Sequence, residues 1–249
     1  FDGAQRPIPR TFQYSFGFQR ELPGKLVIDL TYAGSQTVKD SMPLQLNAVG
    51  WDDFNRGGDE AAYLNRRVPS PFYGILPADS DLGASLTVTG YNLLRPNPLF
   101  LGIAQTTNPW ARYRYDSFQL AAERKFEDFA PGGIFTFLFS YTFSKSFEQA
   151  RRLNDWNLNE APVKQLTAFD KPHTVALSGL WELPFGWGRK YGGGVNRGVG
   201  ALINGWSVDW ILAYNAGYPV ARPDAQFLCS SYNATNRQSH AEWFNNDPG

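Results

Sequence analysis

Apolar and polar residues alternate at every second position in several long stretches of this chain. In the clearest stretch, Phe135, Phe137, Phe139, Tyr141 and Phe143 are separated mostly by small or hydroxylic residues. A β-strand turns successive side chains to opposite faces, so this stretch predicts a strand with one aromatic and one polar face. Strands of about ten residues with this alternation are the sequence signature of a transmembrane β-barrel.

The same alternation recurs along the chain and predicts six long strands. They span roughly 10–21, 25–35, 113–127, 133–146, 172–183 and 205–217. We expect the apolar faces to contact lipid through Phe12, Tyr14, Phe16, Phe18, Leu26, Ile28, Leu30, Phe135, Phe137, Phe139, Tyr141, Phe143, Trp206 and Trp210. The opposite faces carry polar residues nearer mid-strand, and we expect these to face the lumen: Asp29, Gln119, Glu123, Glu182 and Asp209.

The connections between the predicted strands alternate between short and long. Turn-forming residues mark the short ones at 23–24, near 128–132 and in the Gly-rich stretch 184–200. The long ones cover about 36–112, 147–171 and 219–249. Outer-membrane barrels combine short periplasmic turns with long extracellular loops in this way. The predicted fold class of residues 1–249 is therefore all-β, an antiparallel transmembrane β-barrel segment of about six long strands.

Charge and composition restrict the function further. The 249 residues include 23 Lys+Arg and 23 Asp+Glu, a balance that gives no reason to expect a nucleic-acid partner. On the aromatic faces, charges stand at strand ends: Arg10 and Arg20 bracket the first strand, and Asp116 and Arg124 bracket the third. A charge facing lipid costs about 2–4 kcal/mol at mid-bilayer and close to nothing at the interface. The charges thus lie where a barrel tolerates them.

Six strands are fewer than the eight of the smallest single-chain barrels. An open sheet edge in lipid leaves backbone groups without hydrogen-bond partners, at several kcal/mol each. We therefore expect the partners of this sheet to be outer-membrane lipid and further strands, supplied by a longer polypeptide or by other chains.

Short motifs in a consistent order resemble the Oar-like TonB-dependent outer-membrane receptors. They include Phe18-Gln19-Arg20-Glu21-Leu22-Pro23-Gly24, Tyr115-Asp116-Ser117-Phe118-Gln119, Ser140-Tyr141-Thr142-Phe143-Ser144-Lys145-Ser146 and Phe169-Asp170-Lys171-Pro172-His173. The resemblance implies a barrel of about 22 strands in the bacterial outer membrane, with a plugged lumen. It also implies ligand uptake driven by a TonB-type energy-coupling complex. The family's plug, energy-coupling box and carboxypeptidase-regulatory-like domain have no counterpart in this sequence, so we expect a mid-barrel segment.

One predicted outer loop contains a cluster of oxygen-bearing side chains. Its members are Asn154, Asp155, Asn157, Asn159 and Glu160. Hard cations such as Ca²⁺ take oxygen ligands from loops of this kind. The spacing lacks the ordered pattern of a calcium-binding loop, so we expect a solvated polar loop and no metal.

Tryptophans in the predicted loops are the other candidates for binding. Trp51, Trp110 and Trp156 could stack on sugars or anchor peptides, and we favour the alternative that they pack the loops together. The only histidines are His173 and His240, and neither accompanies a nucleophile motif such as G-x-S-x-G. We expect neither an enzyme nor a cofactor.

The first functional expectation is a receptor segment for energy-coupled ligand uptake. One alternative is an outer-membrane adhesion, structural or assembly-scaffold protein, which an upstream plug would argue against. A second alternative is a soluble β-sandwich that binds carbohydrate, in which the aromatic face would pack into a core.

Overall fold

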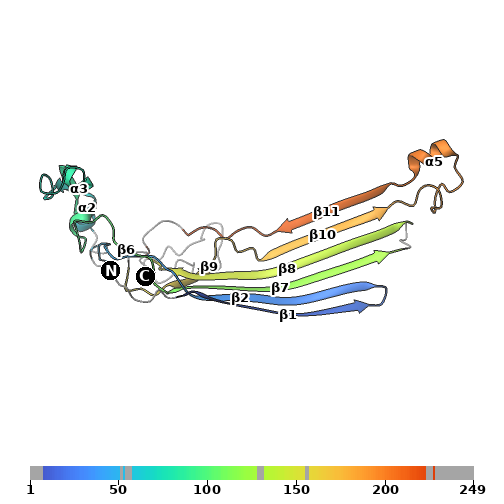
Figure 1. Cartoon of the computed structure of the whole chain (residues 1–249), viewed down its shortest axis with the longest axis horizontal. Coiled ribbons are helices and arrows are strands. Elements are labelled where there is room, and N and C mark those ends of the chain that lie inside the picture. Colours follow the sequence, from blue (N-terminus) through green and yellow to red (C-terminus); the bar gives the residue numbers. More distant parts are fainter. Residues whose placement is uncertain are drawn as a thin grey trace.

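One antiparallel sheet dominates the computed structural model, which describes residues 8–50, 53, 58–127, 132–154, 157–222 and 227. Its strands are β1 (Arg10–Leu22), β2 (Leu26–Asp40), β7 (Ala111–Phe126), β8 (Ile134–Arg151), β9 (Val163–Leu166), β10 (His173–Glu182) and β11 (Ser207–Asn215). The spatial order is β1-β2-β7-β8-β10-β11, and the short β9 pairs with β8. Figure 1 shows the long strands side by side, with their turns at one end and the long connections at the other.

Each predicted strand range overlaps one of the six long strands, and the predicted antiparallel all-β class is confirmed. The main differences lie at the loop end, where β2 continues to Asp40 and β8 to Arg151. The apolar alternation ends earlier than these strands do, but backbone pairing continues: Arg10 still pairs with Val38, and Arg112 with Gln149. A strand that extends beyond an apolar environment keeps its hydrogen bonds without keeping its hydrophobic pattern.

The pairing register places most aromatic residues of the long strands on one face, and Tyr113 and Tyr115 of β7 are the exceptions. Directly paired residues in a sheet share a face. Phe18 pairs with Leu30, Leu30 with Leu120, and Leu120 with Tyr141. Tyr141 then pairs with Val175, and Val175 with Tyr214. We call this side of the sheet the aromatic face and the other side the polar face.

Nothing in the described part of the chain packs a second sheet onto the aromatic face. Phe12, Phe16 and Phe18 are 57%, 65% and 65% exposed, and Leu212 is 62% exposed. The expected core of a soluble sandwich is therefore not present among the described residues. The soluble carbohydrate-binding alternative would need such a partner layer over its aromatic side chains.

Two aromatic side chains of this face lie across glycines of the neighbouring strand. A Cβ at Gly34 would stand 2.6 Å from the ring of Tyr14, and one at Gly179 would stand 2.4 Å from the ring of Trp210. The absence of a side chain at each glycine leaves room for the ring to lie flat against the sheet. This pairing covers glycine backbone that would otherwise weaken a strand.

The connections at the turn end differ in size. Pro23, Gly24 and Lys25 close the β1–β2 hairpin, with Gly24 at φ 85° and Lys25 at φ 59°. The connection between β10 and β11 is larger than the expected flexible turn, because it contains the helix α5 (Arg197–Ile203). Asn196 caps this helix by accepting a hydrogen bond from the Val199 amide at 2.9 Å.

The long β2–β7 connection is folded into small elements, which the alternation pattern did not predict. They are β3 (Leu44–Gln45), α2 (Gly58–Asn65), β4 (Arg67–Pro69), α3 (Asp81–Ala84), β5 (Thr87–Thr89), α4 (Gly90–Leu93) and β6 (Ala104–Gln105). β3 pairs with β6, and β4 with β5. We call residues 41–110 the outer layer. None of the described helices is long and apolar enough to cross a membrane.

Buried side chains hold the outer layer against the sheet. Met42, Leu44 and Ala111 form a small core, with Tyr113 and Ala150 packed against it. Asn47 is fully buried, and its amide nitrogen donates to the carbonyls of Asn97 and Phe100 at 3.0 and 2.6 Å. Its amide oxygen accepts from the Asn97 N–H at 2.8 Å. The Asn47 side chain thus holds three backbone groups of a distant segment through hydrogen bonds.

Candidate ligand-binding site

A polar band closes the aromatic face at its loop end. Asp116 accepts hydrogen bonds from the hydroxyls of Tyr14 and Tyr32, at 2.9 and 2.7 Å. The Arg114 guanidinium contacts the same carboxylate at 2.6 Å. Further along the sheet, the Tyr141 hydroxyl and His173 Nδ1 are hydrogen-bonded at 2.9 Å. The charged residues of this face therefore stand at its loop end, where tyrosine and histidine side chains can hydrogen-bond to them.

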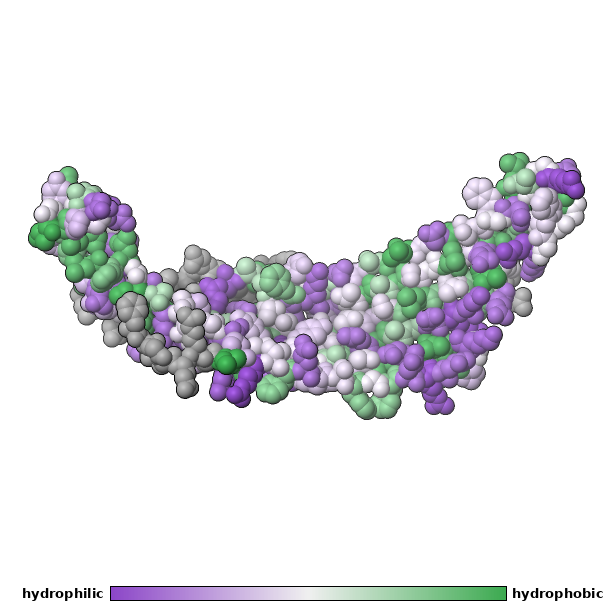
Figure 2. Space-filling model, viewed as in Figure 1, coloured by the Kyte–Doolittle hydropathy of each residue, from purple (hydrophilic) through white to green (hydrophobic). Residues whose placement is uncertain are grey.

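Arg124 marks the other limit of the apolar band, with its guanidinium 3.9 Å from the centre of the Phe126 ring. Asp116 and Arg124 lie eight residues apart on β7, which is about 27 Å of extended strand. The apolar band of an outer-membrane barrel is about 25 Å tall. Hydrophilic residues gather at the turn end of β1, β2 and β7 (Figure 2). The spacing of polar ends thus fits one crossing of a bilayer.

All five residues expected to face the lumen lie on the polar face. Glu123 pairs with Val27, Gln119 with Thr31, and Asp209 with Leu180. Asp29 accepts a hydrogen bond from the Thr31 hydroxyl at 2.8 Å, and Glu182 pairs with Arg189 at 3.0 Å. The residues expected to face lipid lie on the aromatic face, apart from Trp206, which immediately precedes β11. That one face contacts lipid and the other lines a lumen stays a prediction.

The oxygen-rich loop uses its side chains to hold the loop itself. Asn154 is buried and exchanges two hydrogen bonds with the backbone of Phe227, at 2.9 and 2.8 Å. Asn157 accepts from the Asn159 amide, and Glu160 accepts from the Asn154 amide. Asp155 lies outside the described residues. Among the residues that the structure describes, no group of three or more His, Cys, Asp and Glu could hold a metal ion.

Of the three candidate tryptophans, only Trp110 belongs to the described residues; Trp51 and Trp156 lie outside them. The Arg152 guanidinium stands 5.2 Å from the centre of the Trp110 ring. Arg152 is 1% exposed and donates from Nε to the Glu160 carbonyl at 2.7 Å. The Trp110 side chain therefore takes part in packing two outer connections together, although 47% of it remains exposed.

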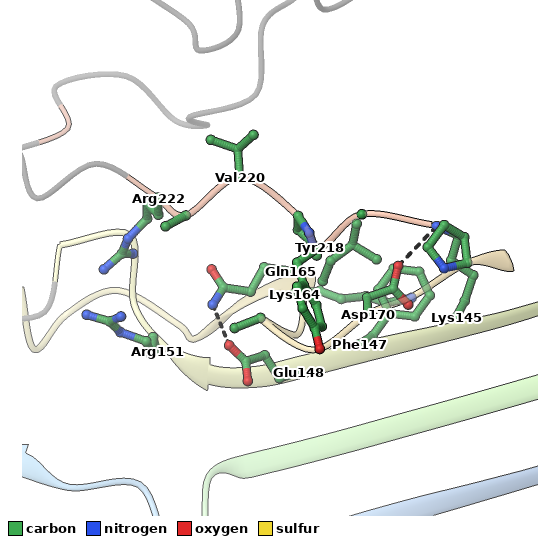
Figure 3. A pocket seen from close by; sticks show the side chains of 16 residues that line it. Lys145, Phe147, Glu148, Arg151, Lys164, Gln165, Asp170, Tyr218, Val220 and Arg222 are labelled. Atoms are coloured by element: carbon green, nitrogen blue, oxygen red, sulfur yellow. Dashed lines mark hydrogen bonds and ion pairs between the residues drawn. The ribbon is translucent and has the colours of Figure 1, made fainter. Parts of the chain in front are cut away.

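A pocket of about 570 Å³ lies at the loop end, between β9 with the end of β8 and the segment 217–222 that follows β11. Its charged lining consists of Lys145, Glu148, Arg151, Lys164, Asp170 and Arg222. Figure 3 shows Arg151 and Arg222 on opposite walls at one end of the pocket, and Lys145 and Asp170 at the other. We call this cavity the outer pocket.

Hydrogen bonds already engage both acids of the outer pocket. The Asp170 side chain is 2% exposed and contacts the Lys145 ammonium at 3.2 Å and the Ser146 amide at 2.7 Å. Glu148 accepts from the Gln165 amide at 2.6 Å. The Lys164 ammonium lies 4.3 Å from the centre of the Phe147 ring. These contacts fix the walls of the pocket, whose described lining includes four basic and two acidic side chains.

Sequence reasoning did not find the outer pocket. Three of its basic residues, Arg151, Lys164 and Arg222, lie within predicted loops, and Lys145 lies near the end of a predicted strand. They belong to segments more than fifty residues apart, such as Arg151 and Arg222. No spacing rule joins such segments. The pairing of β9 with the end of β8 and the hydrogen bonds from Arg222 to the Arg152 and Leu153 carbonyls bring them together.

An open antiparallel sheet with one aromatic face, polar ends and a folded outer layer has the features of a membrane β-barrel wall. A family model described as an outer membrane beta barrel domain matches residues 3–246. The chain belongs to this family and is a protein of the bacterial outer membrane. Searches of curated proteins and of solved structures found no match.

Proposed function

We propose that the chain forms part of the barrel of an energy-coupled receptor of the TonB-dependent type, which captures ligand with its outer layer. The observation that carries this proposal is the attachment of the outer layer to the polar face. Tyr113 and Ala150, which pack against Met42 and Leu44, have the polar-face parity of their strands. The outer layer therefore leans over the side that a closed barrel would enclose. A layer in that position can hold ligand above a lumen.

The open edges of the sheet favour a barrel wall that is larger than this segment. Within the described residues, no strand pairs with the outer edge of β1 or of β11. Both edges would expose unpaired N–H and C=O groups to lipid, at several kcal/mol for each group. Additional strands are the physical solution, and barrels of about 22 strands have room for a plug.

A surface role in adhesion or assembly is the second candidate. It is favoured by apolar side chains at the far side of the outer layer, where Tyr73, Ile75 and Leu86 are 53%, 79% and 67% exposed. Exposed apolar groups in one region often mark contacts with other proteins. Such a role would not require energy coupling.

Cysteine labelling in living cells separates the two candidates without knowledge of the ligand. In a Cys229→Ser background, Ser140→Cys places a thiol on the polar face of β8, and Phe139→Cys places one on the aromatic face. We expect a membrane-impermeant maleimide to label position 140 faster in energised cells than after addition of an uncoupler, because a plug that moves changes access to the lumen. Position 139 is the control and should not respond.

If the labelling rate at position 140 is the same with and without the uncoupler, this would contradict energy-coupled uptake and support the surface role. The mass of the native polypeptide in a detergent extract gives an independent check. A full receptor barrel with plug should weigh about three times the 27.9 kDa of this chain or more.

A further inference from the structure

The connection between β10 and β11 is a folded element that extends beyond the turn end of the sheet (Figure 1). We call residues 183–206 the α5 connection. The Leu183 amide donates to the Trp206 carbonyl at 2.9 Å, which ties the two ends of the connection together. Inside it, the Trp187 ring lies so close to Gly200 of α5 that a Cβ there would stand 2.5 Å away. The connection therefore presents a defined surface and is more than a flexible turn.

One part of this surface is apolar and exposed. Val199 and Leu202 lie three residues apart, on the same side of α5, and are 43% and 74% exposed. Trp206 follows the helix and is 62% exposed. Its indole donates to the Leu202 carbonyl at 2.6 Å, so the ring lies beside the last turn of α5. Large apolar groups that are exposed together mark a contact with another protein or with a membrane.

The apolar patch continues the aromatic face of the sheet. Trp206 has the same parity as Trp210, which belongs to that face. The register through Gly179 and Phe137 places Trp210 level with Arg124, which marks the limit of the apolar band. Trp206 lies four residues further along the chain, which is about 13 Å of extended strand. The patch therefore stands just beyond the apolar band, where a bilayer has its headgroups and where aromatic side chains of membrane proteins gather.

The charges of the α5 connection have one sign. Residues 183–206 contain Arg189, Lys190 and Arg197 and no Asp or Glu. Arg189 pairs with Glu182 of β10 at 3.0 Å. Lys190 and Arg197 are exposed, and among the residues that the structure describes no carboxylate pairs with either of them. Two positive charges beside an apolar patch suit a surface that is both apolar and negatively charged.

We propose that the α5 connection is an interfacial anchor, which lies on the anionic phospholipid leaflet at the turn end of the sheet. A segment of this kind buries its apolar side among the headgroups, while its basic side chains contact lipid phosphates. A protein partner would also cover the patch, but continuity with the aromatic face and the excess of positive charge favour lipid. The anchor needs neither a plug nor energy coupling, so the inference is independent of the proposed receptor function.

Contact between position 202 and lipid tests the proposal in the native full-length protein. In a Cys229→Ser background, Leu202→Cys carries an environment-sensitive fluorophore, and the protein is placed in vesicles of phosphatidylcholine and phosphatidylglycerol that contain nitroxide-labelled lipid. Leu86→Cys is the matched control, because Leu86 is 67% exposed in the outer layer, at the opposite end of the sheet. We expect the nitroxide to quench most of the emission at position 202 and little of the emission at position 86.

Equal quenching at the two positions would overturn the proposal. So would a fluorophore at position 202 that is shielded from water but is not quenched by the nitroxide, because a protein partner would then cover the patch.

The basic residues of the connection provide a second test. Quenching at position 202 should increase with the fraction of phosphatidylglycerol, and Lys190→Gln together with Arg197→Gln should abolish this dependence. Each lost charge should shift the equilibrium between bound and free connection about fivefold. Arg197 is the first residue of α5, where a positive charge opposes the helix dipole, so its removal leaves the helix in place.

Lys25→Gln is the matched control for charge, since Lys25 is 74% exposed in the hairpin at the same end of the sheet. It should keep the dependence on phosphatidylglycerol. Quenching that does not depend on phosphatidylglycerol in the unchanged protein, or the same result for the double variant and for Lys25→Gln, would overturn the proposal.

Discussion

The strand wall and the outer layer are held together in different ways. In the wall, many equivalent pairs contribute, and the register of a whole strand follows from which face is apolar. In the outer layer and in the connection after β8, single buried polar side chains carry much of the structure: Asn47 bonds three backbone groups, and Arg152 bonds the Glu160 carbonyl and covers Trp110. The stability of the wall should therefore depend on which face a substitution changes. The stability of the outer layer should depend on which single residue is replaced.

A charge placed at mid-strand gives the largest expected effect on the wall. Phe139 lies centrally on the aromatic face of β8, paired with Ala122 and Leu177. If the aromatic face contacts lipid as predicted, Phe139→Arg should lower the free energy of unfolding by about 2–4 kcal/mol. Denaturant unfolding of the native full-length protein in lipid vesicles measures this.

Ser140→Arg is the matched comparison, since it adds the same charge one residue further along on the polar face. Its cost should be clearly smaller if that face lines a wet lumen. Equal losses of stability at the two positions would mean that the two faces do not differ in their surroundings, and would contradict the lipid and lumen assignments.

Arg152, at the start of the connection after β8, gives the largest expected effect among the outer connections. Its Nε donates to the Glu160 carbonyl, its guanidinium covers Trp110, and its own carbonyl accepts from Arg222. Arg152→Met keeps the volume but loses the charged hydrogen bond and the cation–π contact, which together stabilise the local structure by about 2–3 kcal/mol. We expect limited proteolysis in the connection after β8 to become at least about tenfold faster, with the wall intact.

Arg112→Met serves as the control, because Arg112 is an exposed residue near the same end of the sheet. If both variants were cleaved at the rate of the unchanged protein, the connection after β8 would not depend on Arg152. If the wall of the Arg152 variant also unfolded more easily, the two regions would be coupled and the comparison would need revision.

The same contrast explains what the sequence could predict. Alternation in Phe135–Phe143 and its counterparts marks strands directly, because one apolar face fixes both the strand and its parity. The outer ends of β2 and β8 escaped prediction because their pairing continues where neither face needs to be apolar. The small elements of the outer layer and the outer pocket escaped it because Asn47, Arg152 and Arg222 contact partners far away in the chain. No local pattern records such contacts.

Asn47 should show a smaller and more local effect than Arg152. Asn47→Ala leaves the amide of Asn97 and the carbonyls of Asn97 and Phe100 without their partner, at a local cost of about 1–2 kcal/mol. Hydrogen exchange at residues 97–103 should become about five- to thirtyfold faster, while exchange in β7 and β8 stays unchanged. Asn65→Ala, at an exposed position of α2, is the control. Unchanged exchange at 97–103 would remove Asn47 as an anchor of this layer.

The smallest expected effect belongs to Gly179, where the wall too depends on one particular contact. A Cβ at this position would lie 2.4 Å from the Trp210 ring, so Gly179→Ala forces the ring away from the sheet. If this face contacts lipid as predicted, the ring can swing outward, and we expect a cost of about 0.5–1.5 kcal/mol. The red edge of the tryptophan emission spectrum and vesicle unfolding would both report the displacement. Gly194→Ala meets open space in the β10–β11 connection and is the control. A cost as large as that of Phe139→Arg would show that the ring has nowhere to go, which would place another layer of protein, and not lipid, against this part of the aromatic face.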